Sequence, residues 1–331
     1  MSKTLNWAII GCGVISESHL DAIISLKHTK LYAVCDIIEE RAKEKQEKYH
    51  AEKLYTDYKE MLSDPAVDVV SICTPSGMHA EMAIAAANAG KHIFCEKPMD
   101  VTAAKMDAMI ESIEKNNVKC GCVFQRRTYP EAIAARKFIE EHDLGPIIFA
   151  EARLKYYRDQ AYYDSGDWRA TWELDGGGAL MNQGIHQLDL FQYLMGEVEE
   201  VFAYCATRSH ERIDVEDLCM ASLKFKNGAL GLLEASTVAK PGFYTRIDVN
   251  GEKGSVILQN NTIQQWKVDG EEERQGQPTE LPHRLQLQEI TDSILTGKEP
   301  EVNGREALKV LCLVEAIYRS AQTGKTEKVH Y

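Results

Sequence analysis

The first 124 residues of this chain repeat one pattern, in which a short apolar run is followed by a longer amphipathic run. The apolar runs lie at 6–10, 31–35, 69–73, 92–95 and 119–124. The amphipathic runs predict helices at 18–25, 39–49, 59–63, 78–89 and 103–116. Strands that alternate with helices form a parallel sheet covered on both faces, and strands this apolar are typical of such burial. The pattern therefore predicts an α/β domain over residues 1–124, with the doubly wound parallel sheet of a Rossmann fold.

The pattern changes after Phe124, where strands begin to follow one another directly. A helix is expected at 131–141, a strand at 147–155, and a glycine-rich helix start near Gly176. Further strands are expected at 201–207, 218–225, 230–236, 245–251 and 254–259, and closing helices at 284–296 and 305–323. Strands without crossover helices pair mainly antiparallel. Residues 125–331 are therefore predicted to form a second, α+β domain with a large, mainly antiparallel sheet, and the polar stretch 268–281 a mobile loop.

Composition excludes several classes of partner. The formal net charge is −13, whereas nucleic-acid-binding surfaces carry an excess of Lys and Arg, so we expect no nucleic-acid partner. No apolar run reaches the roughly 20 residues that span a bilayer, and the N-terminus lacks the apolar segment of a signal peptide. The nine cysteines show neither a disulfide framework nor metal-ligand spacing. We expect no membrane association, no bound metal and a cytoplasmic location.

The turn Gly11-Cys12-Gly13-Val14-Ile15-Ser16 lies between the first strand and the first helix. Gly11 permits a tight turn, Gly13 lets the backbone approach a pyrophosphate, and the amides that open the helix point at that phosphate. Val14 and Ile15 belong to the same turn, and Ser16 replaces the third glycine of the fingerprint. Asp36 follows the second strand, where a carboxylate can bind both ribose hydroxyls and would repel a 2′-phosphate. These residues predict NAD as cofactor; the alternative is a chance glycine turn with an aspartate that caps a helix.

Three further segments resemble the Gfo/Idh/MocA dehydrogenases, a family that includes glucose–fructose oxidoreductase and inositol dehydrogenase. The segments are Cys73-Thr74-Pro75-Ser76-Gly77-Met78-His79, Glu96-Lys97-Pro98 and Gly176-Gly177-Gly178-Ala179-Leu180-Met181-Asn182-Gln183-Gly184-Ile185-His186-Gln187-Leu188-Asp189. The resemblance covers essentially the whole chain. It implies a Rossmann domain followed by a domain that contacts substrate and often forms the oligomer interface. It also implies oxidation or reduction of a carbinol carbon in sugars, inositols or nucleotide sugars, by a homodimer or homotetramer.

The chemistry requires a group that takes the hydroxyl proton. Lys97 follows a buried strand at the carboxyl end of the sheet, where ligands bind and where burial lowers a lysine pKa; the alternative is a surface lysine. Asn182 and His186 are four residues apart and would share one face of a helix. His186 is expected as base or as donor to the developing alkoxide, with Asp189 orienting it or capping backbone. Many family members have aspartate at Asn182, and an amide cannot share a proton, which leaves the base open and favours Lys97.

The resemblance also implies the remaining site residues. The cofactor is expected to contact Thr74, His79, Glu96, Lys97, Gln125, Trp168 and Arg169. The substrate is expected to contact Lys97, Arg126, Tyr157, Asn182 and His186. The strip of aromatic and basic residues around Tyr157 suits a sugar ring and an anionic group, although packing between domains would explain it equally well.

We therefore predict an NAD-dependent oxidoreductase that transfers a hydride between nicotinamide and a secondary alcohol or ketone of a sugar, a sugar derivative or a cyclitol. The Trp-Arg pair and the glycine-rich motif look most like the subgroup with UDP-N-acetylglucosaminuronate 3-dehydrogenases, but a monosaccharide or inositol substrate is equally compatible. The alternatives are a non-catalytic NAD-sensing module and an oxidoreductase that retains its cofactor between two sugars.

Overall fold

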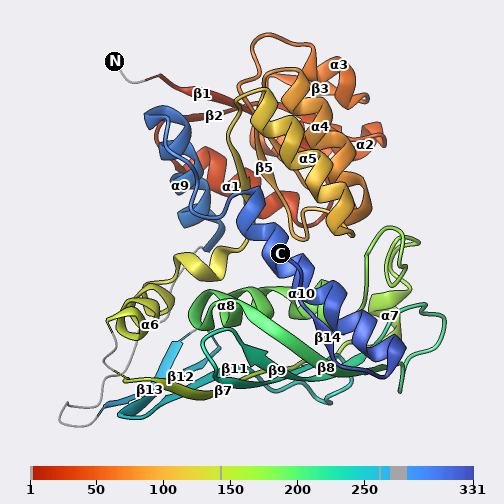
Figure 1. Cartoon of the computed structure of the whole chain (residues 1–331). Coiled ribbons are helices and arrows are strands. Elements are labelled where there is room, and N and C mark those ends of the chain that lie inside the picture. Colours follow the sequence, from red (N-terminus) through yellow and green to blue (C-terminus); the bar gives the residue numbers. More distant parts are fainter. Residues whose placement is uncertain (1–2, 142–143, 261, 269–281) are drawn as a thin grey trace. The chain divides into compact units, whose positions relative to one another are not determined.

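The chain forms two compact units in the computed structural model, which describes residues 3–141, 144–260, 262–268 and 282–331 (Figure 1). Unit 1 contains Met1–Val123 and Leu281–Leu308, and unit 2 contains Phe124–Glu280 and Lys309–Tyr331. The division differs from the predicted domains 1–124 and 125–331 because the segment Leu281–Leu308 returns to unit 1. Its helix α9 (Pro282–Thr296) packs against α1 (Ser16–Ser25), and Leu287 and Ile290 are buried in the core of unit 1.

Unit 1 contains a six-stranded parallel sheet in the order β3-β2-β1-β4-β5-β6. The strands are β1 (Leu5–Ile10), β2 (Thr29–Cys35), β3 (Lys53–Tyr55), β4 (Val69–Ile72), β5 (His92–Cys95) and β6 (Cys120–Cys122). This strand order is that of the Rossmann fold, in which ligands bind at the carboxyl ends of the strands near the switch between β1 and β4. The predicted doubly wound sheet is therefore confirmed. The short edge strand β3 was not predicted, since it has only three residues, none of which is fully buried.

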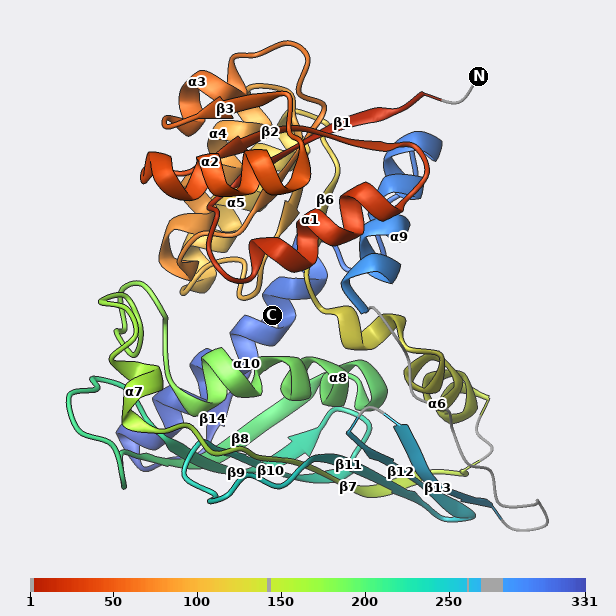
Figure 2. The ribbon, with the colours of Figure 1, turned by 180° about the vertical axis from the view of Figure 1, so that it is seen from behind.

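Helices cover both faces of the sheet in unit 1. They are α1, α2 (Glu39–Tyr49), α3 (Tyr58–Leu62), α4 (His79–Asn88), α5 (Ala103–Lys115), α9 and the short η1 (Ser76–Met78). Helices α4 and α5 pack together on the face that is in front in Figure 1. Helices α1 and α2 come to the front in the opposite view (Figure 2). Strand β4 is buried throughout, and β1 and β5 are buried except at Asn6 and His92, as their apolar composition predicted.

Unit 2 contains an eight-stranded sheet in the order β13-β12-β11-β7-β10-β9-β8-β14. The strands are β7 (Ile147–Lys155), β8 (Val198–Ala206), β9 (Leu218–Phe225), β10 (Leu230–Ser236), β11 (Thr245–Gly251), β12 (Gly254–Gln259), β13 (Thr262–Val268) and β14 (Glu327–Lys328). Only β7 and β10 pair in parallel, and the other neighbours are antiparallel. The predicted mainly antiparallel sheet is confirmed, with β13 and β14 as unpredicted edge strands. The predicted loop 268–281 lies outside the described residues except Val268, which ends β13.

Several helices accompany this sheet. They are η2 (Gln125–Thr128), α6 (Pro130–Glu140), α7 (Gln160–Tyr163), the π-helical turn η3 (Ala179–Gly184), α8 (Ile185–Met195) and α10 (Gly304–Thr323), whose first residues belong to unit 1. Helix α8 packs on β7 and on α6, and η3 packs on β10. Both views show α8 on one face of the sheet (Figures 1 and 2). In the part of the chain that the structure describes, no helix is long and apolar enough to cross a bilayer.

Candidate cofactor and catalytic sites

The glycine turn lies at the carboxyl end of β1, as the sequence predicted. Gly11 has a φ of +93°, and a Cβ at this position would lie 2.9 Å from the backbone of Cys73, so both conformation and space require glycine. A Cβ at Gly13 would meet nothing within 4 Å, which leaves open space for a ligand above the turn. Ser16, in the third glycine position, is fully buried and donates to the Gly13 carbonyl at 2.6 Å. A serine at this position is therefore small enough for α1 to pack on the sheet.

The surroundings of the turn suit a dinucleotide. Ile15 occupies the N-cap of α1 and offers no side-chain acceptor, and the amides of Ser16, Glu17 and Ser18 donate to backbone carbonyls of the turn at 3.1–3.3 Å. The positive end of the helix dipole still points at the turn, where it favours an anion. Val14 and Ile37 are 92% and 86% exposed beside the turn, and exposed apolar side chains of this kind favour the flat face of a base. The residues present therefore fit the dinucleotide that the fold implies.

Asp36 lies beside the turn and is half-buried. One carboxylate oxygen accepts the Cys12 amide of the turn at 2.8 Å, and the other accepts the Ile38 amide at the start of α2 at 2.8 Å. The local bond to Ile38 is the one that a capping aspartate would make, whereas the bond to Cys12 connects the carboxylate to the glycine turn. A carboxylate has about four acceptor sites, so two further sites can receive ribose hydroxyls.

His79 connects two loops at the same edge of the sheet. Its buried ring lies 2.8 Å from the carbonyl oxygen of Thr74, after β4, and 2.7 Å from that of Pro98, after β5. Both ring nitrogens therefore contact backbone. His79 thus connects the two loops that are predicted to bind cofactor. Thr74 is half-buried, and its hydroxyl donates to the Met82 sulfur at 3.4 Å.

Lys97 follows β5 at the carboxyl end of the sheet and is half-buried, and its peptide bond to Pro98 is cis. Its backbone amide donates to the Glu96 carboxylate at 3.1 Å. Glu96, a predicted cofactor ligand, is 5% exposed, and its carboxylate contacts His19 and His283. Sequence reasoning missed both histidines, because no spacing relates α1, β5 and α9. Unit 1 therefore brings the glycine turn, Asp36, Thr74 and Lys97 to one edge of one sheet.

The structure corrects the helix that carries Asn182 and His186 in unit 2. The regular helix α8 begins only at Ile185, and Asn182 lies in the wider π-helical turn η3 that precedes it. The predicted i, i+4 relation between Asn182 and His186 therefore spans the π-helical turn and the first turn of α8. The Asn182 amide group donates to Asp175, which also accepts the Ala170 backbone amide at 2.9 Å. The ring of His186 meets that of Phe124 edge-on, with centroids 6.0 Å apart.

The glycine run Gly176–Gly178 is explained by two residues that the sequence analysis missed. A Cβ at Gly177 would overlap the Tyr318 hydroxyl, and a Cβ at Gly178 would overlap the Glu216 carbonyl oxygen. The buried Glu216 carboxylate accepts the amides of Gly178 at 3.0 Å and Leu180 at 2.8 Å, and the Tyr318 hydroxyl at 3.0 Å. Burial raises the pKa of Glu216, and its hydrogen bonds oppose that rise. Glu216 and Tyr318 thus hold the start of the π-turn.

Asp189 was expected to orient His186 or to cap backbone. In the structure both of its oxygens receive the Arg127 guanidinium at 2.6–3.1 Å, and both side chains are buried. This pair connects η2 to α8 within unit 2. A buried carboxylate needs a counter-charge and hydrogen bonds, which accounts for the bidentate arginine.

The remaining predicted residues of unit 2 lie on η2 and just after the end of β7. Gln125 is half-buried, and its side-chain oxygen has no hydrogen-bond partner among the described residues. Arg126 is buried and donates to Gln187 and, at 3.4 Å, to the Tyr156 hydroxyl. Tyr157 is half-buried, with the Lys240 ammonium 5.4 Å from its ring centroid.

A cluster of aromatic and cationic side chains adjoins Asn182. Arg169 stacks on Trp168 and Tyr162, with centroid distances of 4.5 and 4.6 Å, and Arg158 lies 5.1 Å from the Tyr162 centroid. The Tyr162 hydroxyl accepts from Arg169 at 2.9 Å and lies 3.5 Å from the Asn182 side-chain oxygen. We call Arg158, Arg169 and Tyr162 the arginine–tyrosine cluster.

Comparisons with known proteins agree with this organisation. Residues 5–124 match the model of an oxidoreductase family with an NAD-binding Rossmann fold, and residues 132–257 match the GFO/IDH/MocA C-terminal domain. The chain is 31% identical to myo-inositol 2-dehydrogenase of Thermotoga maritima over 97% of each chain. It is 30% identical to levoglucosan dehydrogenase of Pseudarthrobacter phenanthrenivorans over 77% of this chain and 74% of that one.

Solved structures show the same likeness over the full length. The WlbA dehydrogenase of Bordetella pertussis, solved with NADH and UDP-GlcNAcA, matches with a TM-score of 0.92 and 32% identity over 99% of this chain and 100% of that one. Both family models and a full-length relative thus agree with the motifs that the sequence carries. The chain belongs to the Gfo/Idh/MocA oxidoreductase family.

Proposed function

We propose that this oxidoreductase transfers a hydride between the nicotinamide of NAD and a secondary alcohol or ketone of a sugar, a sugar derivative or a cyclitol. One observation carries the proposal: a single edge of the unit 1 sheet holds the open glycine turn, Asp36 and Lys97. A dinucleotide site and an ionisable lysine next to it are what alcohol oxidation requires. The inositol and levoglucosan dehydrogenases among the relatives act on alcohols of this kind.

The residues of this chain have separate tasks in that reaction. The glycine turn and Asp36 bind and orient the dinucleotide, which accepts or supplies the hydride when bound. Lys97 accepts the hydroxyl proton during oxidation and returns it during reduction. His186 serves the same hydroxyl as base or as hydrogen-bond donor, and Asn182 contributes a neutral amide. Lys97 is the stronger candidate for the base because the amide of Asn182 cannot share a proton with the imidazole.

The test of this assignment is Lys97→Ala, compared with Lys115→Ala, which removes an exposed lysine from α5. Loss of a general base lowers kcat by about 100- to 10,000-fold, while the Kd for NAD changes little. NADH formation is followed by absorbance with a panel of inositols, sugars and UDP-sugars, and nicotinamide content is measured in the purified protein. Full turnover by Lys97→Ala would remove Lys97 from the mechanism. Absence of turnover by wild type would favour a sensing role, and stoichiometric nicotinamide would favour a shuttle between two sugars.

We further propose that the substrate carries an anionic group. The side-chain hydrogen bonds of Arg158 and Arg169 go to neutral groups, namely Gln183, Ser165 and Tyr162. No carboxylate of the described residues lies within 4.0 Å of either guanidinium, although the chain has a net charge of −13. Two guanidinium groups without a carboxylate partner favour a phosphate or carboxylate ligand. WlbA, which was solved in complex with UDP-GlcNAcA, provides an example of a relative that binds an anionic sugar derivative.

The charge preference is tested with matched substrates. UDP-N-acetylglucosaminuronate is compared with UDP-N-acetylglucosamine, which lacks the carboxylate, and with myo-inositol, which lacks both charges. Arg158→Gln and Arg169→Gln should each raise KM for the anionic substrate about tenfold, the loss of one charged hydrogen bond. The proposal fails if myo-inositol is the best substrate and the two variants leave its kinetics unchanged.

We also propose that the protein assembles with copies of itself through one face of the unit 2 sheet and that it acts in the cytoplasm. Phe149, Tyr204, Met220, Leu230 and Leu232 are 46–69% exposed on this sheet. Cross-strand pairing places them on the same face. A contiguous exposed apolar patch favours an interface. All nine cysteines are free, and eight of them are buried, which suits a reducing compartment.

A further inference from the structure

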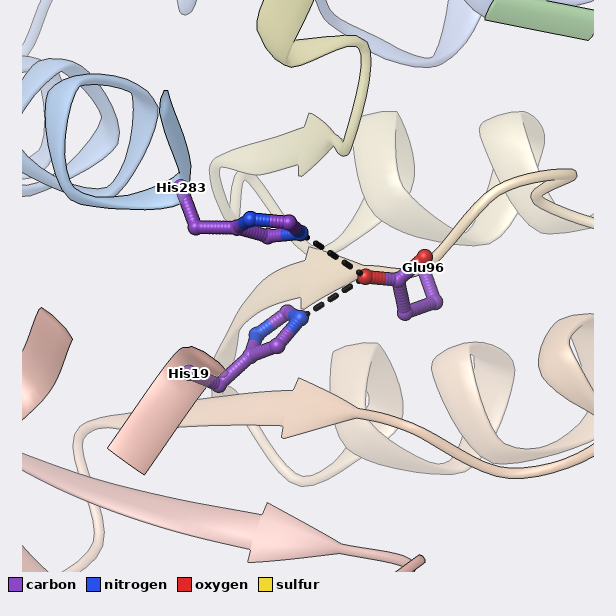
Figure 3. Close-up of side chains that lie close together, drawn as sticks. All are labelled: His19, Glu96 and His283. Carbon is purple, nitrogen blue, oxygen red and sulfur yellow. Dashed lines mark hydrogen bonds and ion pairs between the residues drawn. The ribbon is translucent and has the colours of Figure 1, made fainter. Parts of the chain in front are cut away.

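Three side chains from distant parts of the sequence converge in unit 1, as Figure 3 shows. His19 lies on α1, the helix that follows the glycine turn; Glu96 follows β5; and His283 lies in the first turn of α9. The two imidazoles point at the same oxygen of Glu96. His19 is fully buried and Glu96 nearly so, whereas the His283 side chain is 17% exposed. We call these residues the His–Glu–His cluster.

The hydrogen bonds of the cluster account for both ring nitrogens of His19. Its Nε2 lies 2.8 Å from Glu96 Oε1, and its Nδ1 lies 2.7 Å from the hydroxyl of Ser71 on β4. A proton on Nε2 makes the contact with Glu96 attractive, and the Ser71 hydroxyl can then donate to Nδ1. The Nε2 of His283 lies 3.7 Å from the same carboxylate oxygen. The cluster thus connects α1, β4, β5 and α9.

Glu96 is held as an anion in a buried position. Burial alone would raise the pKa of its carboxyl, but the contacts with His19 and His283 outweigh burial and hold that pKa well below its ordinary range. A buried carboxylate without such partners would carry a large desolvation cost. The two histidines therefore keep a negative charge at the carboxyl end of β5.

The other oxygen of Glu96 acts on Lys97. Glu96 Oε2 accepts the Lys97 backbone amide at 3.1 Å, which defines where residue 97 leaves the strand. From the other side, His79 contacts the carbonyl oxygen of Pro98 at 2.7 Å. The backbone of the lysine is thus held on both sides by buried side chains, and a lysine that must reach a hydroxyl depends on such placement.

We propose that Glu96 is a positioning residue for Lys97, held in place by His19 and His283, and not a cofactor ligand. The proposal rests on the proposed function, in which Lys97 transfers the hydroxyl proton. His283 comes from a segment far along the chain and completes the cluster on its more exposed side. Removing the charge of Glu96 should therefore change the placement of Lys97 more than it changes the binding of NAD.

The same three side chains could instead hold a metal ion, since their ligand atoms lie within 4.8 Å of one another. The geometry favours hydrogen bonding. A metal-bound nitrogen must be deprotonated, whereas the 2.8 Å contact between His19 and Glu96 and the second contact to Ser71 form a complete hydrogen-bond chain. Metal content therefore becomes an outcome of the test.

The experiment compares Glu96→Gln, His283→Gln and the double variant with wild type, and uses Glu114→Gln as control. Glu114 pairs with Arg305 in the same unit, away from Lys97. Glu96→Gln keeps the shape and removes the charge. We expect kcat to fall about 10- to 100-fold, the range that a small misplacement of a catalytic group produces. We expect the Kd for NAD to stay within about twofold of wild type.

His283→Gln should lower kcat less than Glu96→Gln does, by about threefold. It should have no further effect in the Glu96→Gln background, because His283 acts through Glu96.

A second readout does not depend on turnover. Hydrogen exchange of a peptide spanning Ile93–Met99 should be faster in Glu96→Gln than in wild type, because the Lys97 amide loses its charged acceptor. If Lys97→Ala retains turnover while this exchange effect persists, the proposed role of Lys97 fails but its positioning by Glu96 stands.

Four results would overturn the proposal. The first is a Kd for NAD that rises by the same factor by which kcat falls, since that makes Glu96 a cofactor ligand. The second is unchanged kcat and exchange in Glu96→Gln. The third is a His283→Gln effect of undiminished size in the Glu96→Gln background. The fourth is one equivalent of metal in the purified protein that chelation removes together with activity.

Discussion

The Asp36 carboxylate accepts hydrogen bonds from two loops, so replacing Asp36 would affect both of them. One oxygen bonds to the Cys12 amide in the glycine turn and the other to the Ile38 amide before α2. Each oxygen has a further acceptor site that can receive a ribose hydroxyl. A single carboxylate therefore shapes the turn and, in the proposed function, also binds the ribose of the cofactor. The same charge disfavours a 2′-phosphate, so we expect NAD to bind more tightly than NADP.

Asp36→Ala should weaken NAD binding about 10- to 100-fold, since hydrogen bonds to a charged group contribute about 1.5–3 kcal/mol. The Kd is measured by calorimetry. Asp57→Ala is the control, because Asp57 caps α3 through a 2.8 Å bond to the Lys59 amide and does not contact the turn. An unchanged Kd for NAD in Asp36→Ala would contradict cofactor binding by Asp36. The residue would then serve only to cap the start of α2.

Glu96 also makes stability depend on pH in a defined direction. Its pKa lies below the ordinary 4.5 in the folded protein, because the bonds from His19 and His283 outweigh burial. The unfolded chain therefore takes up a proton near pH 4.5, while the folded protein resists protonation. The stabilisation is fully present above that pH and is lost as pH falls through the folded pKa. Burial raises the pKa of the Cys73 thiol, and the negative charge of Glu96 raises it further.

The difference in unfolding free energy between wild type and Glu96→Gln should consequently be constant at neutral pH and shrink as the pH falls below about 4.5. Urea unfolding at a series of pH values measures it. A difference that grows towards acid pH would contradict the ionised, paired state of Glu96.

At the scale of elements, the π-helical turn η3 depends on residues far from it in the chain. Glu216, just before β9, and Tyr318, on α10, occupy the space beside Gly177 and Gly178. The Glu216 carboxylate accepts the amides of Gly178 and Leu180 and is itself held by the Tyr318 hydroxyl. π-Helical turns are rare and frequently lie at functional sites. The turn carries Asn182 and leads directly to His186 at the start of α8. Its geometry therefore decides where both side chains lie.

Gly178→Ala should destabilise the protein by about 1–3 kcal/mol, because its Cβ would overlap backbone that cannot move aside freely. Thermal and urea unfolding report the loss. Gly324→Ala is the control: a Cβ there meets open space at a φ of +66°, so it bears only the conformational cost. Equal losses of unfolding free energy in Gly178→Ala and Gly324→Ala would show that the overlap with Glu216 adds no cost.

At the scale of the whole molecule, the apolar face of the unit 2 sheet is the feature that a single chain does not explain. In that face Leu230 is paired with Phe149, and Met220 with Tyr204. Leu232 lies next to them and is 53% exposed. Side chains of this size are favourably buried, by about 1.5–3 kcal/mol each. A second copy of the chain that presents the same face would bury them symmetrically.

Leu232→Asp should raise the dissociation constant of the assembly at least about 30-fold, the effect of losing a central interface residue. Light scattering during size exclusion compares it with wild type against the chain mass of 37.2 kDa. Ile133→Asp provides the control, because Ile133 is a 48% exposed residue on α6. A monomeric wild type, or an equal effect of the control, would rule out this face as the interface.

Local patterns were sufficient for much of this protein. The alternation of apolar and amphipathic runs predicted the parallel sheet, because burial on both faces requires apolar strands. The glycine turn followed by Asp36 predicted where the cofactor binds, since backbone approach to a phosphate needs glycine at set spacings. Family motifs added Lys97 and His186 as candidates.

Contacts between distant segments depended on tertiary packing. The return of α9 to unit 1 and the meeting of His283 with Glu96 follow from side chains buried together, for which no local period exists. The π-turn at Asn182 stands where a helix was expected, and the distant Glu216 accepts the backbone amides of Gly178 and Leu180 at its start. Asp189 likewise pairs with Arg127, because a buried carboxylate needs a counter-charge. Periodicity and spacing report what a segment buries, whereas its partner is decided only when the chain is folded.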